Sequence, residues 1–570
     1  MIRSILNHSH FLFKVFLILS FLIFKISAVS ADQNLDKNNT KIMFDPKFGN
    51  YLAGSYAAQV GDAENAAKFY KHIVDLYPEN YELKIKTIKL FLISGMIVQA
   101  EELLSTLENI NLEEEIIKIF EITIDIRNKD YLSAYSKVQT LPNDGLSNFL
   151  KPVISVWLHL GLDNKFKVEE AIEQLESNSR FNAFNQYHKV LVYDLINHEK
   201  TESLYKSLLG NEETRSIRLI QSYALYLRRV GKTDESLSVV NNYLNANSYN
   251  PIIQESRYNY FNKNFSRSVN SANDGIAEVF YATAKALSES EDFFISTIFL
   301  RLAIVLRPHS SISYILLNEI LEQRGKWALA IEPLSKLNTD TPLGEYSIIK
   351  IARNLNRLSR TDEAFELLNS YILRNPETIE GFEALGDLYR SKKMWVKAAE
   401  NYTQAIKKKK LINKNDWKVF YSLGISYERA KKWKKAEPNF KKALELQPDQ
   451  PLVMNYLAYS WVEQGRNLDE ALSMIEKAVI LRPRDGYIAD SLGWVHFRLG
   501  NFEKAVQKLE RAIILEPEDP VINEHLGDAY WEVGRFREAV FQWKRALDFG
   551  PDADLIPKIK VRIKKGLSKI

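Results

Sequence analysis

Residue types that could support catalysis are scattered through this chain of 570 residues. Gly231-Lys232-Thr233 has the residues that end a phosphate-binding loop, but Tyr226 stands where such a loop needs a glycine. The nine His are dispersed without the spacing of metal ligands. Neither a Gly-x-Ser-x-Gly elbow nor a His-Glu-x-x-His pair occurs. We therefore expect no enzyme activity, no metal site and no cofactor.

The composition excludes several further classes of protein. A hydrophobic share of 46% with 26% charged residues is typical of a globular chain and not of a disordered one. The absence of Cys excludes disulfide scaffolds, thiol catalysis and zinc ribbons. A net charge of +4 gives no general attraction to nucleic acid, so no nucleic-acid partner is expected.

The first 31 residues are typical of an export signal. Arg3 and Lys14 precede an apolar run from Val15 to Phe24, and small residues follow at 28–31. That run is too short to span a bilayer as a helix. We predict a signal peptide at 1–31 and a linker at 32–46. The alternative is an uncleaved anchor at 11–29, which would hold the chain at a membrane.

A motif recurs about every 34 residues, most clearly towards the C-terminus. One copy, in 417–450, consists of Leu423, Gly424, Tyr427, Ala436, Phe440, Ala443 and Pro448. The small residues at the eighth and twentieth positions would let two helices pack closely, and the proline would end the second helix. A glycine suited to the turn between the helices recurs at the fifteenth position, as Gly61, Gly95, Gly231, Gly325, Gly465, Gly500 and Gly534.

This pattern resembles the tetratricopeptide (TPR) repeat. The resemblance implies an all-α, TPR-like α-solenoid in which antiparallel helix pairs contact their neighbours and coil into a right-handed superhelix with a concave groove. About a dozen units are expected. They begin near Lys47, Tyr81, Glu115, Phe149, Ala183, Ile217, Ala277, Ser311, Glu345, Ile379, Trp417, Pro451, Gly486 and Pro520.

The phase of the repeat suggests two arrays. The first covers 47–250, with a faint motif at 149–216, and the second covers 277–552. Between them, the Asn- and Ser-rich segment 251–276 is too short for a unit and is interpreted as a joint that includes a helix near 252–261. Residues 553–570 fit a capping helix with Ile556, Ile559, Ile563 and Leu567 on one side. A membrane-surface helix is the alternative.

In TPR-like units the concave surface is lined by positions 2, 5, 9, 12 and 13 of the first helix. The resemblance therefore implies a partner-binding groove lined by Asn455, Tyr459, Asp490, Trp494, Phe497, Glu524, Asp528 and Trp531. Aromatic side chains among carboxylates suit a peptide with apolar anchors and basic neighbours. The tryptophans could instead pack between superhelical turns. Glu383, Asp387, Asp490 and Glu524 stand where chaperone adaptors of this family carry basic or amide residues, which argues against an acidic C-terminal peptide.

A basic block extends from residue 392 to residue 442. Fifteen Lys and Arg429 face four acidic residues there, which gives +12, so the rest of the chain carries −8. Two groups stand out within expected loops: Lys407, Lys408, Lys409 and Lys410, and Lys431, Lys432, Lys434 and Lys435. They form either a solvated surface or a site for an anionic membrane, a glycan or an acidic protein.

The leading hypothesis is a non-catalytic scaffold, exported to a bacterial periplasm, that binds protein or peptide partners in its groove during envelope assembly. The alternative is an envelope-surface factor that handles polysaccharide or lipid, including lipopolysaccharide, through the basic block.

Overall fold

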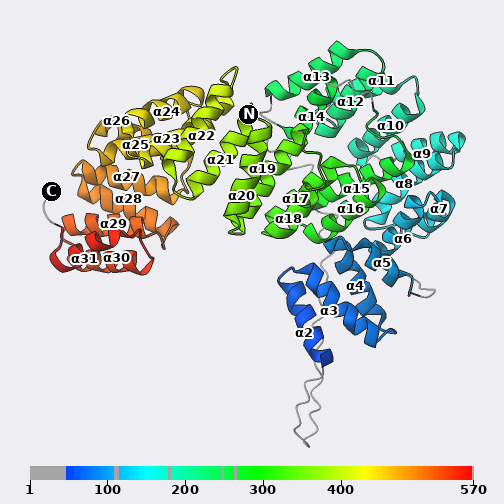
Figure 1. The fold of residues 1–570 in the computed structure, drawn as a ribbon, viewed down its shortest axis with the longest axis horizontal. Helices are drawn as coiled ribbons and strands as arrows, with labels where there is room; N and C mark the ends of the chain where they lie inside the picture. The colour runs from blue at the N-terminus through cyan, green and yellow to red at the C-terminus, as the bar shows by residue number, and fades with distance from the viewer. Residues whose placement is uncertain (1–45, 108–113, 178–180, 247–249, 262–265, 568–570) are drawn as a thin grey trace, which may run out of the picture. The chain divides into compact units, whose positions relative to one another are not determined.

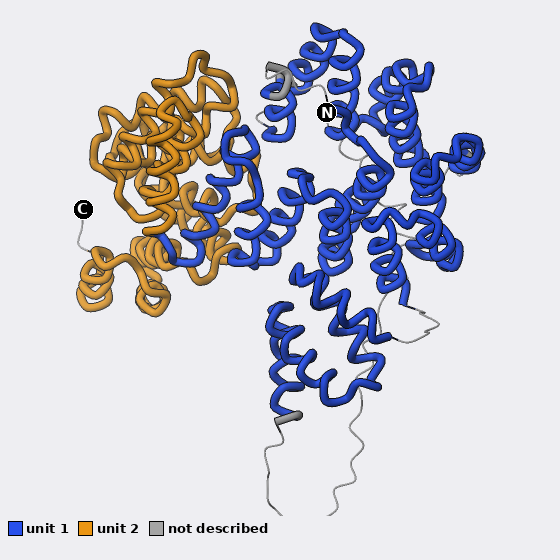
Figure 2. Tube along the Cα trace, turned by 45° about the vertical axis from the view of Figure 1, so that its right-hand side comes forward, with its two compact units in different colours: residues 1–361 blue, residues 362–570 orange. Residues whose placement is uncertain are grey.

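The computed structural model describes residues 46–107, 114–177, 181–246, 250–261 and 266–567. These ranges are α-helical and contain no β-strand. The predicted signal peptide and nearly all of the predicted linker lie outside them. The chain divides into two compact units, Met1–Thr361 and Asp362–Ile570 (Figure 2). The boundary lies at the first residue of α20, whereas the segment 251–276 lies inside unit 1.

Unit 1 contains helices α2 to α19 (Figure 1). They are α2 (Pro46–Gln59), α3 (Ala63–Leu76), α4 (Tyr81–Ser94), α5 (Ile97–Leu104), α6 (Glu115–Arg127), α7 (Tyr131–Gln139), α8 (Ser147–Gly161), α9 (Lys165–Ser177), α10 (Asn182–Ile196), α11 (Thr201–Gly210), α12 (Ile217–Arg229), α13 (Thr233–Ala246), α14 (Pro251–Phe261), α15 (Ala272–Glu289), α16 (Phe293–Leu306), α17 (Ser311–Gln323), α18 (Trp327–Leu334) and α19 (Pro342–Arg357).

Unit 2 contains the remaining helices and one short 3₁₀ turn, η2. They are α20 (Thr361–Arg374), α21 (Ile379–Ser391), α22 (Trp395–Lys408), η2 (Lys414–Asp416), α23 (Trp417–Arg429), α24 (Trp433–Leu446), α25 (Pro451–Glu463), α26 (Leu468–Leu481), α27 (Gly486–Arg498), α28 (Phe502–Leu515), α29 (Pro520–Glu532), α30 (Phe536–Asp548) and α31 (Leu555–Lys565).

The repeat register predicted from the motif persists through the region where the motif is faint. Segment 149–216 consists of two helix pairs, α8–α9 and α10–α11. The fifteenth residue of each predicted unit has a positive φ. The seven glycines have this conformation, and so do Lys129, Asp163, Asn197, Glu291, Ser359, Lys393 and Lys431. A residue with a Cβ pays roughly 1–2 kcal/mol for this conformation, so the turn tolerates loss of glycine without losing its geometry.

The glycines at the eighth position allow the two helices of a unit to pack closely. A Cβ on Gly424 would lie 2.7 Å from the ring of Phe440, and one on Gly527 would lie 2.5 Å from the ring of Trp543. Both rings are fully buried. The large side chain at position 24 thus covers the glycine of its own unit.

Unit 1 departs from the expectation that each helix pair contacts only its neighbours. The hairpin α15–α16 packs against α4, α6, α8 and α10, the first helices of four earlier pairs (Figure 1). Tyr131 donates a hydrogen bond to Asn273 at 2.9 Å, and the indole of Trp157 lies against Gly275. The inner face of the first array is therefore filled by a later part of the same chain.

The sequence explains this filling. α6 carries Ile residues over most of its circumference, with Lys118, Glu121 and Asp125 on the remaining side. The segment Phe293–Leu306 of α16 has one charged residue, Arg301, and therefore almost no polar face. A helix without a polar face is stable in water only when it is covered on both sides. One hydrophobic cluster accordingly extends from α2 to α18. Unit 2 has the simpler arrangement, because its helices contact those next to them or the first helix of the adjacent pair.

Candidate partner-binding surfaces

The eight predicted groove residues lie on the first helices of three successive pairs, α25, α27 and α29, but few of them are open to solvent. Asp490, Trp494, Phe497, Glu524 and Asp528 are buried, and the other three are half-buried. The rule that positions 2, 5, 9, 12 and 13 line the concave surface thus predicted that these residues lie on first helices, but it did not predict their burial. That these side chains contact a partner stays a prediction.

Trp494 is held by contacts within unit 2. Its ring stacks on the imidazole of His525 with centroids 4.0 Å apart and on Phe497 at 4.8 Å. Its indole N–H donates a hydrogen bond to Glu463 at 2.6 Å. His525 lies 2.9 Å from the Asp490 carboxylate. These contacts explain the burial of Trp494 without a partner.

The next part of the groove is closed by α31. Arg562 of this helix forms an ion pair with Glu524 and also lies 3.0 Å from the carboxyl group of Asp528. Asp528 also accepts a hydrogen bond from the indole of Trp543 at 2.9 Å. Ile559 of α31 is fully buried, and Ile563 packs against the core. The helix expected as a cap therefore covers two of the carboxylates expected to bind a partner.

The stability of unit 2 is expected to fall as the pH rises from 6 to 8. Burial raises the pKa of Asp528 to about 7, so the folded chain retains a proton that the unfolded chain loses at about pH 4. Burial alone would lower the pKa of His525, but Asp490 raises it above its ordinary value. The stability that His525 gains from its proton is therefore complete below about pH 6.5 and is lost as the pH rises further. Asp528 and His525 therefore both make unit 2 less stable as the pH rises.

The expected loss in the free energy of unfolding from Asp528 between these pH values is about 1 kcal/mol. Thermal unfolding measured at both pH values tests it, with hydrogen exchange of α29 to localise the change. Asp528→Asn should reduce the pH dependence, whereas Glu503→Gln, at an exposed position on α28, should leave it as it is. An unchanged pH dependence in Asp528→Asn would contradict this assignment.

The open part of the concave face lies on α25. Tyr459 and Asn455 are half-buried there, one turn apart. The side-chain oxygen of Asn455 is buried and has no hydrogen-bond partner among the described residues. Burial raises the pKa of Tyr459, and so do the nearby carboxylates of Glu463 and Asp490, so its hydroxyl stays protonated and can donate a hydrogen bond. This surface offers one unused acceptor beside one donor.

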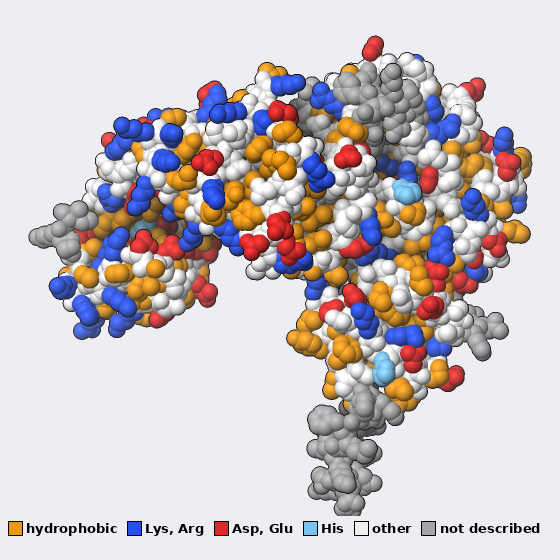
Figure 3. Space-filling model, viewed as in Figure 1, with side chains coloured by type: hydrophobic (Ala, Val, Ile, Leu, Met, Phe, Trp, Pro, Cys, Tyr) orange, Lys and Arg blue, Asp and Glu red, His pale blue; other side chains and the backbone are white. Residues whose placement is uncertain are grey.

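The basic block divides into paired and exposed lysines. Lys407 and Lys408 were predicted to lie in a loop, but they lie in the last turn of α22. Lys409 forms ion pairs with Glu383 at 3.0 Å and Asp416 at 2.9 Å, and Lys408 pairs with Glu377. Of the eight lysines in the two groups, the exposed ones are Lys407, Lys410, Lys431, Lys432, Lys434 and Lys435. Figure 3 shows Lys and Arg side chains on the surface over α24.

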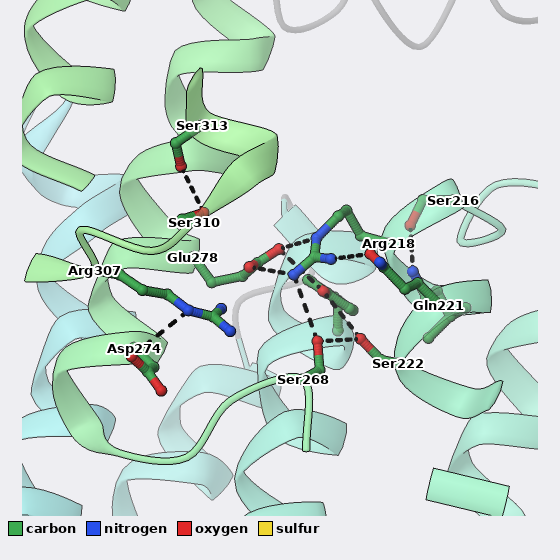
Figure 4. A network of polar contacts seen from close by, with 12 residues as sticks. Ser216, Arg218, Gln221, Ser222, Ser268, Asp274, Glu278, Arg307, Ser310 and Ser313 are labelled. Atoms are coloured by element: carbon green, nitrogen blue, oxygen red, sulfur yellow. Dashed lines mark hydrogen bonds and ion pairs between the residues drawn. The ribbon is translucent and has the colours of Figure 1, made fainter. Parts of the chain in front are cut away.

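Unit 1 contains a polar site that the sequence analysis missed. Arg218 of α12 binds Glu278 of α15 through two hydrogen bonds, at 2.8 and 2.6 Å (Figure 4). Tyr187 of α10 donates to the same carboxylate at 3.1 Å, and Ser268 contacts Arg218 at 3.4 Å. Burial disfavours the charged form of Glu278, but Arg218 brings the pKa of Glu278 below its ordinary value. The pair is therefore ionised inside the protein.

Two clefts adjoin this ion pair. One has a volume of about 520 Å³ and mixed walls that include Phe184, Tyr281 and Glu319. The other, of about 250 Å³, is polar and includes Arg267 and Arg307. The sequence did contain one sign of this buried ion pair, because Glu278 interrupts the apolar run from Ile276 to Tyr281. A carboxylate in such a run is buried with a partner.

The described residues contain no group of three or more His, Asp or Glu side chains placed to hold a metal ion. Gly231-Lys232-Thr233 lies at the turn between α12 and α13, where Lys232 pairs with Glu202 at 2.6 Å. None of the described helices has the length and hydrophobicity to span a bilayer.

Comparisons with known proteins identify the repeat. Residues 417–450 match the tetratricopeptide repeat model, and residues 493–534 match a second TPR repeat model. No curated protein is significantly similar in sequence.

Similar solved structures include the APC/C hetero-tetramer Cut9-Hcn1, with a TM-score of 0.39 and 14% identity over 92% of this chain and 96% of that one. A tetratricopeptide repeat protein from Parabacteroides merdae gives a TM-score of 0.37 and 19% identity over 45% of this chain and 98% of that one. A thermophilic TPR protein of Thermus thermophilus gives 0.29 and 24%, over 33% and 98%. The fold is an all-α solenoid that contains tetratricopeptide repeats, which are typical of protein-interaction scaffolds.

Proposed function

We propose that this chain is a non-catalytic scaffold that binds protein or peptide partners on the concave face of unit 2. The orphaned side-chain oxygen of Asn455 carries the proposal. A buried acceptor without a donor costs roughly 1–3 kcal/mol, and turning the amide of the half-buried Asn455 outward would let a backbone N–H of a bound peptide satisfy it. The hydroxyl of Tyr459, one turn along α25, would donate to a carbonyl of the same peptide.

The charge near this surface favours a partner with basic side chains. Glu428 and Glu463 lie close enough to Tyr459 to raise its pKa, and Arg429 lies close enough to lower it. Arg429 donates a hydrogen bond to the hydroxyl of Tyr456 at 3.2 Å and forms an ion pair with Glu428 at 3.5 Å. Trp494 and Asp490, buried beside this surface, would support it and not contact the partner directly.

Site-specific photocrosslinking in intact cells tests the proposal. A photoreactive residue at position 455 should give a discrete adduct, and Tyr459→Ala should weaken it several-fold. The matched control is position 439, an asparagine on the outer helix α24 whose amide is bound to the carbonyl of Lys435. Equal labelling at 439 and 455, or an adduct indifferent to Tyr459→Ala, would rule out this groove.

Export to a bacterial periplasm and a role in envelope assembly belong to the same proposal. The support is the sequence of residues 1–31, with its basic start, apolar run and small residues. N-terminal sequencing of the chain isolated from the periplasmic fraction should begin at or near Asp32. A chain recovered in the cytoplasm with Met1 intact would contradict export.

A second candidate function is the binding of an anionic membrane or glycan through the basic block. The observation that favours it is Leu411, which is 84% exposed directly after Lys410. An apolar side chain next to exposed lysines suits a lipid headgroup region. Flotation with anionic vesicles should then require Lys407 and Lys410. Lys409 is unsuitable for this test, because its replacement would break the ion pairs with Glu383 and Asp416.

A further inference from the structure

The first described helix, α2, presents an uncovered hydrophobic face. Phe48, Leu52 and Tyr56 are 73%, 66% and 67% exposed and follow one another at intervals of four residues. Tyr51 and Val60 extend the same surface. Figure 3 shows hydrophobic side chains gathered over this helix. Contiguous apolar patches of this kind on a soluble domain mark interaction sites.

Later repeats show what such a face normally contacts. Leu52 and Tyr56 occupy the sixth and tenth positions of their unit. In α29 the same positions are His525 and Ala529, both buried, and His525 packs on Trp494 and Asp490 of the preceding first helix, α27. In α27 they are Ser491 and Val495, also buried, in a helix that contacts both α25 and α26. The face of α2 is thus a helix-packing surface that lacks its helix among the described residues.

The surface is held in place by its own unit. Gly54 of α2 packs on Tyr70 of α3, and the amine of Lys326 donates a hydrogen bond to the carbonyl of Val60 at the end of α2. α2 is therefore anchored at its back and at its C-terminal end, while the apolar side faces outward. A docking partner would meet a preformed surface.

We propose that a second copy of this chain covers this face, with the two α2 helices packed against each other about a two-fold axis. No charged residue occurs between Phe48 and Gln59, so two copies meet without like-charge repulsion. Gly49 has open space around it, which leaves room for close approach of a second helix. A two-fold contact needs only one self-complementary patch.

The available area suits a weak dimer. Covering Phe48, Tyr51, Leu52, Tyr56 and Val60 on both copies would remove roughly 1,100 Å² from water, close to the roughly 1,000 Å² that a specific interface needs. A membrane is a poorer fit, since helices that lie on membranes carry several Lys or Arg along their polar face and α2 has one, Lys47, in its first turn. We expect association at micromolar concentrations.

Sedimentation of the chain as isolated from cells tests the proposal. The mass should rise from one copy to two as the concentration increases, and Leu52→Glu with Tyr56→Glu should weaken the dimer more than tenfold. The matched control is Leu132→Glu on α7, where the leucine is 68% exposed. That variant should dimerise like the natural chain.

Crosslinking keeps the proposal testable if the charged variant folds poorly. The chain has no Cys, so Leu52→Cys introduces a single thiol. Oxidation should join two copies through position 52, whereas Leu132→Cys should stay unlinked. A monomer at every concentration, a dimer that survives Leu52→Glu, or binding to neutral and anionic vesicles through Leu52 would each overturn the proposal.

Discussion

Replacing Trp543 by alanine is expected to lower the free energy of unfolding of unit 2 by about 3–5 kcal/mol. Trp543 is fully buried, and its ring lies over Gly527, whose missing Cβ leaves the room that the indole fills. The ring centroid is 5.4 Å from that of Trp531, and the indole N–H donates a hydrogen bond to the carboxyl group of Asp528. The substitution therefore opens a cavity and removes a hydrogen bond from a buried carboxyl.

Denaturant unfolding followed by tryptophan fluorescence measures this loss, and hydrogen exchange locates it in α29 and α30. Phe541→Ala is the control, because Phe541 lies on the same helix but is 56% exposed. Its effect should stay within about 0.5 kcal/mol. Similar losses for Trp543→Ala and Phe541→Ala would show that the close packing over Gly527 does not stabilise the repeat.

Removing one partner of the Arg218–Glu278 pair is expected to destabilise unit 1 by about 3–5 kcal/mol. In Glu278→Gln the guanidinium keeps its buried position without a counter-charge, and Tyr187 loses a charged acceptor. Replacing both partners, as Arg218→Met with Glu278→Met, leaves no buried charge. The double variant should therefore be more stable than Glu278→Met alone, which the double-mutant cycle of Arg218→Met and Glu278→Met measures directly.

An exposed ion pair of the same unit provides the comparison. Lys206 and Glu202 lie one turn apart on α11 at 2.8 Å, with Lys206 half exposed. Lys206→Ala should leave the free energy of unfolding of unit 1 nearly unchanged. If Glu278→Gln costs no more than Lys206→Ala, the ion pair between α12 and α15 does not stabilise unit 1.

Much of the fold could be predicted from the sequence, because the repeat rests on local contacts. Gly424 and Phe440 belong to one helix pair, and a turn residue at position fifteen needs only a left-handed backbone. For that reason even Phe149 and Ala183, where the motif is faint, mark helix pairs. The packing of α16 against α4 could not be read from periodicity, since it joins segments about two hundred residues apart in the chain.

The candidate groove was predicted less well, because burial depends on side chains from neighbouring repeats. The position rule identifies Trp494 and Asp528 as concave residues. It contains no information that His525 stacks on the first or that Arg562 lies beside the second. The ion pair of Arg218 with Glu278 was missed for a related reason, since its partners come from α12 and α15 and no motif links them.

The contacts of the α15–α16 hairpin have a consequence for how the two units fold. In unit 1 they connect helices distant in sequence, and Lys326 reaches a carbonyl 266 residues away. Such non-local contacts raise the contact order, slow folding and couple the helices into one cooperative transition. In unit 2 the helices contact those next to them or the first helix of the adjacent pair, and the ion pair between Lys393 and Asp552 is an exposed contact over a longer range. The stability of unit 2 is therefore nearly a sum over repeats. One chain thus combines a block that folds as a whole with an array that can lose its terminal helices while the remainder stays folded.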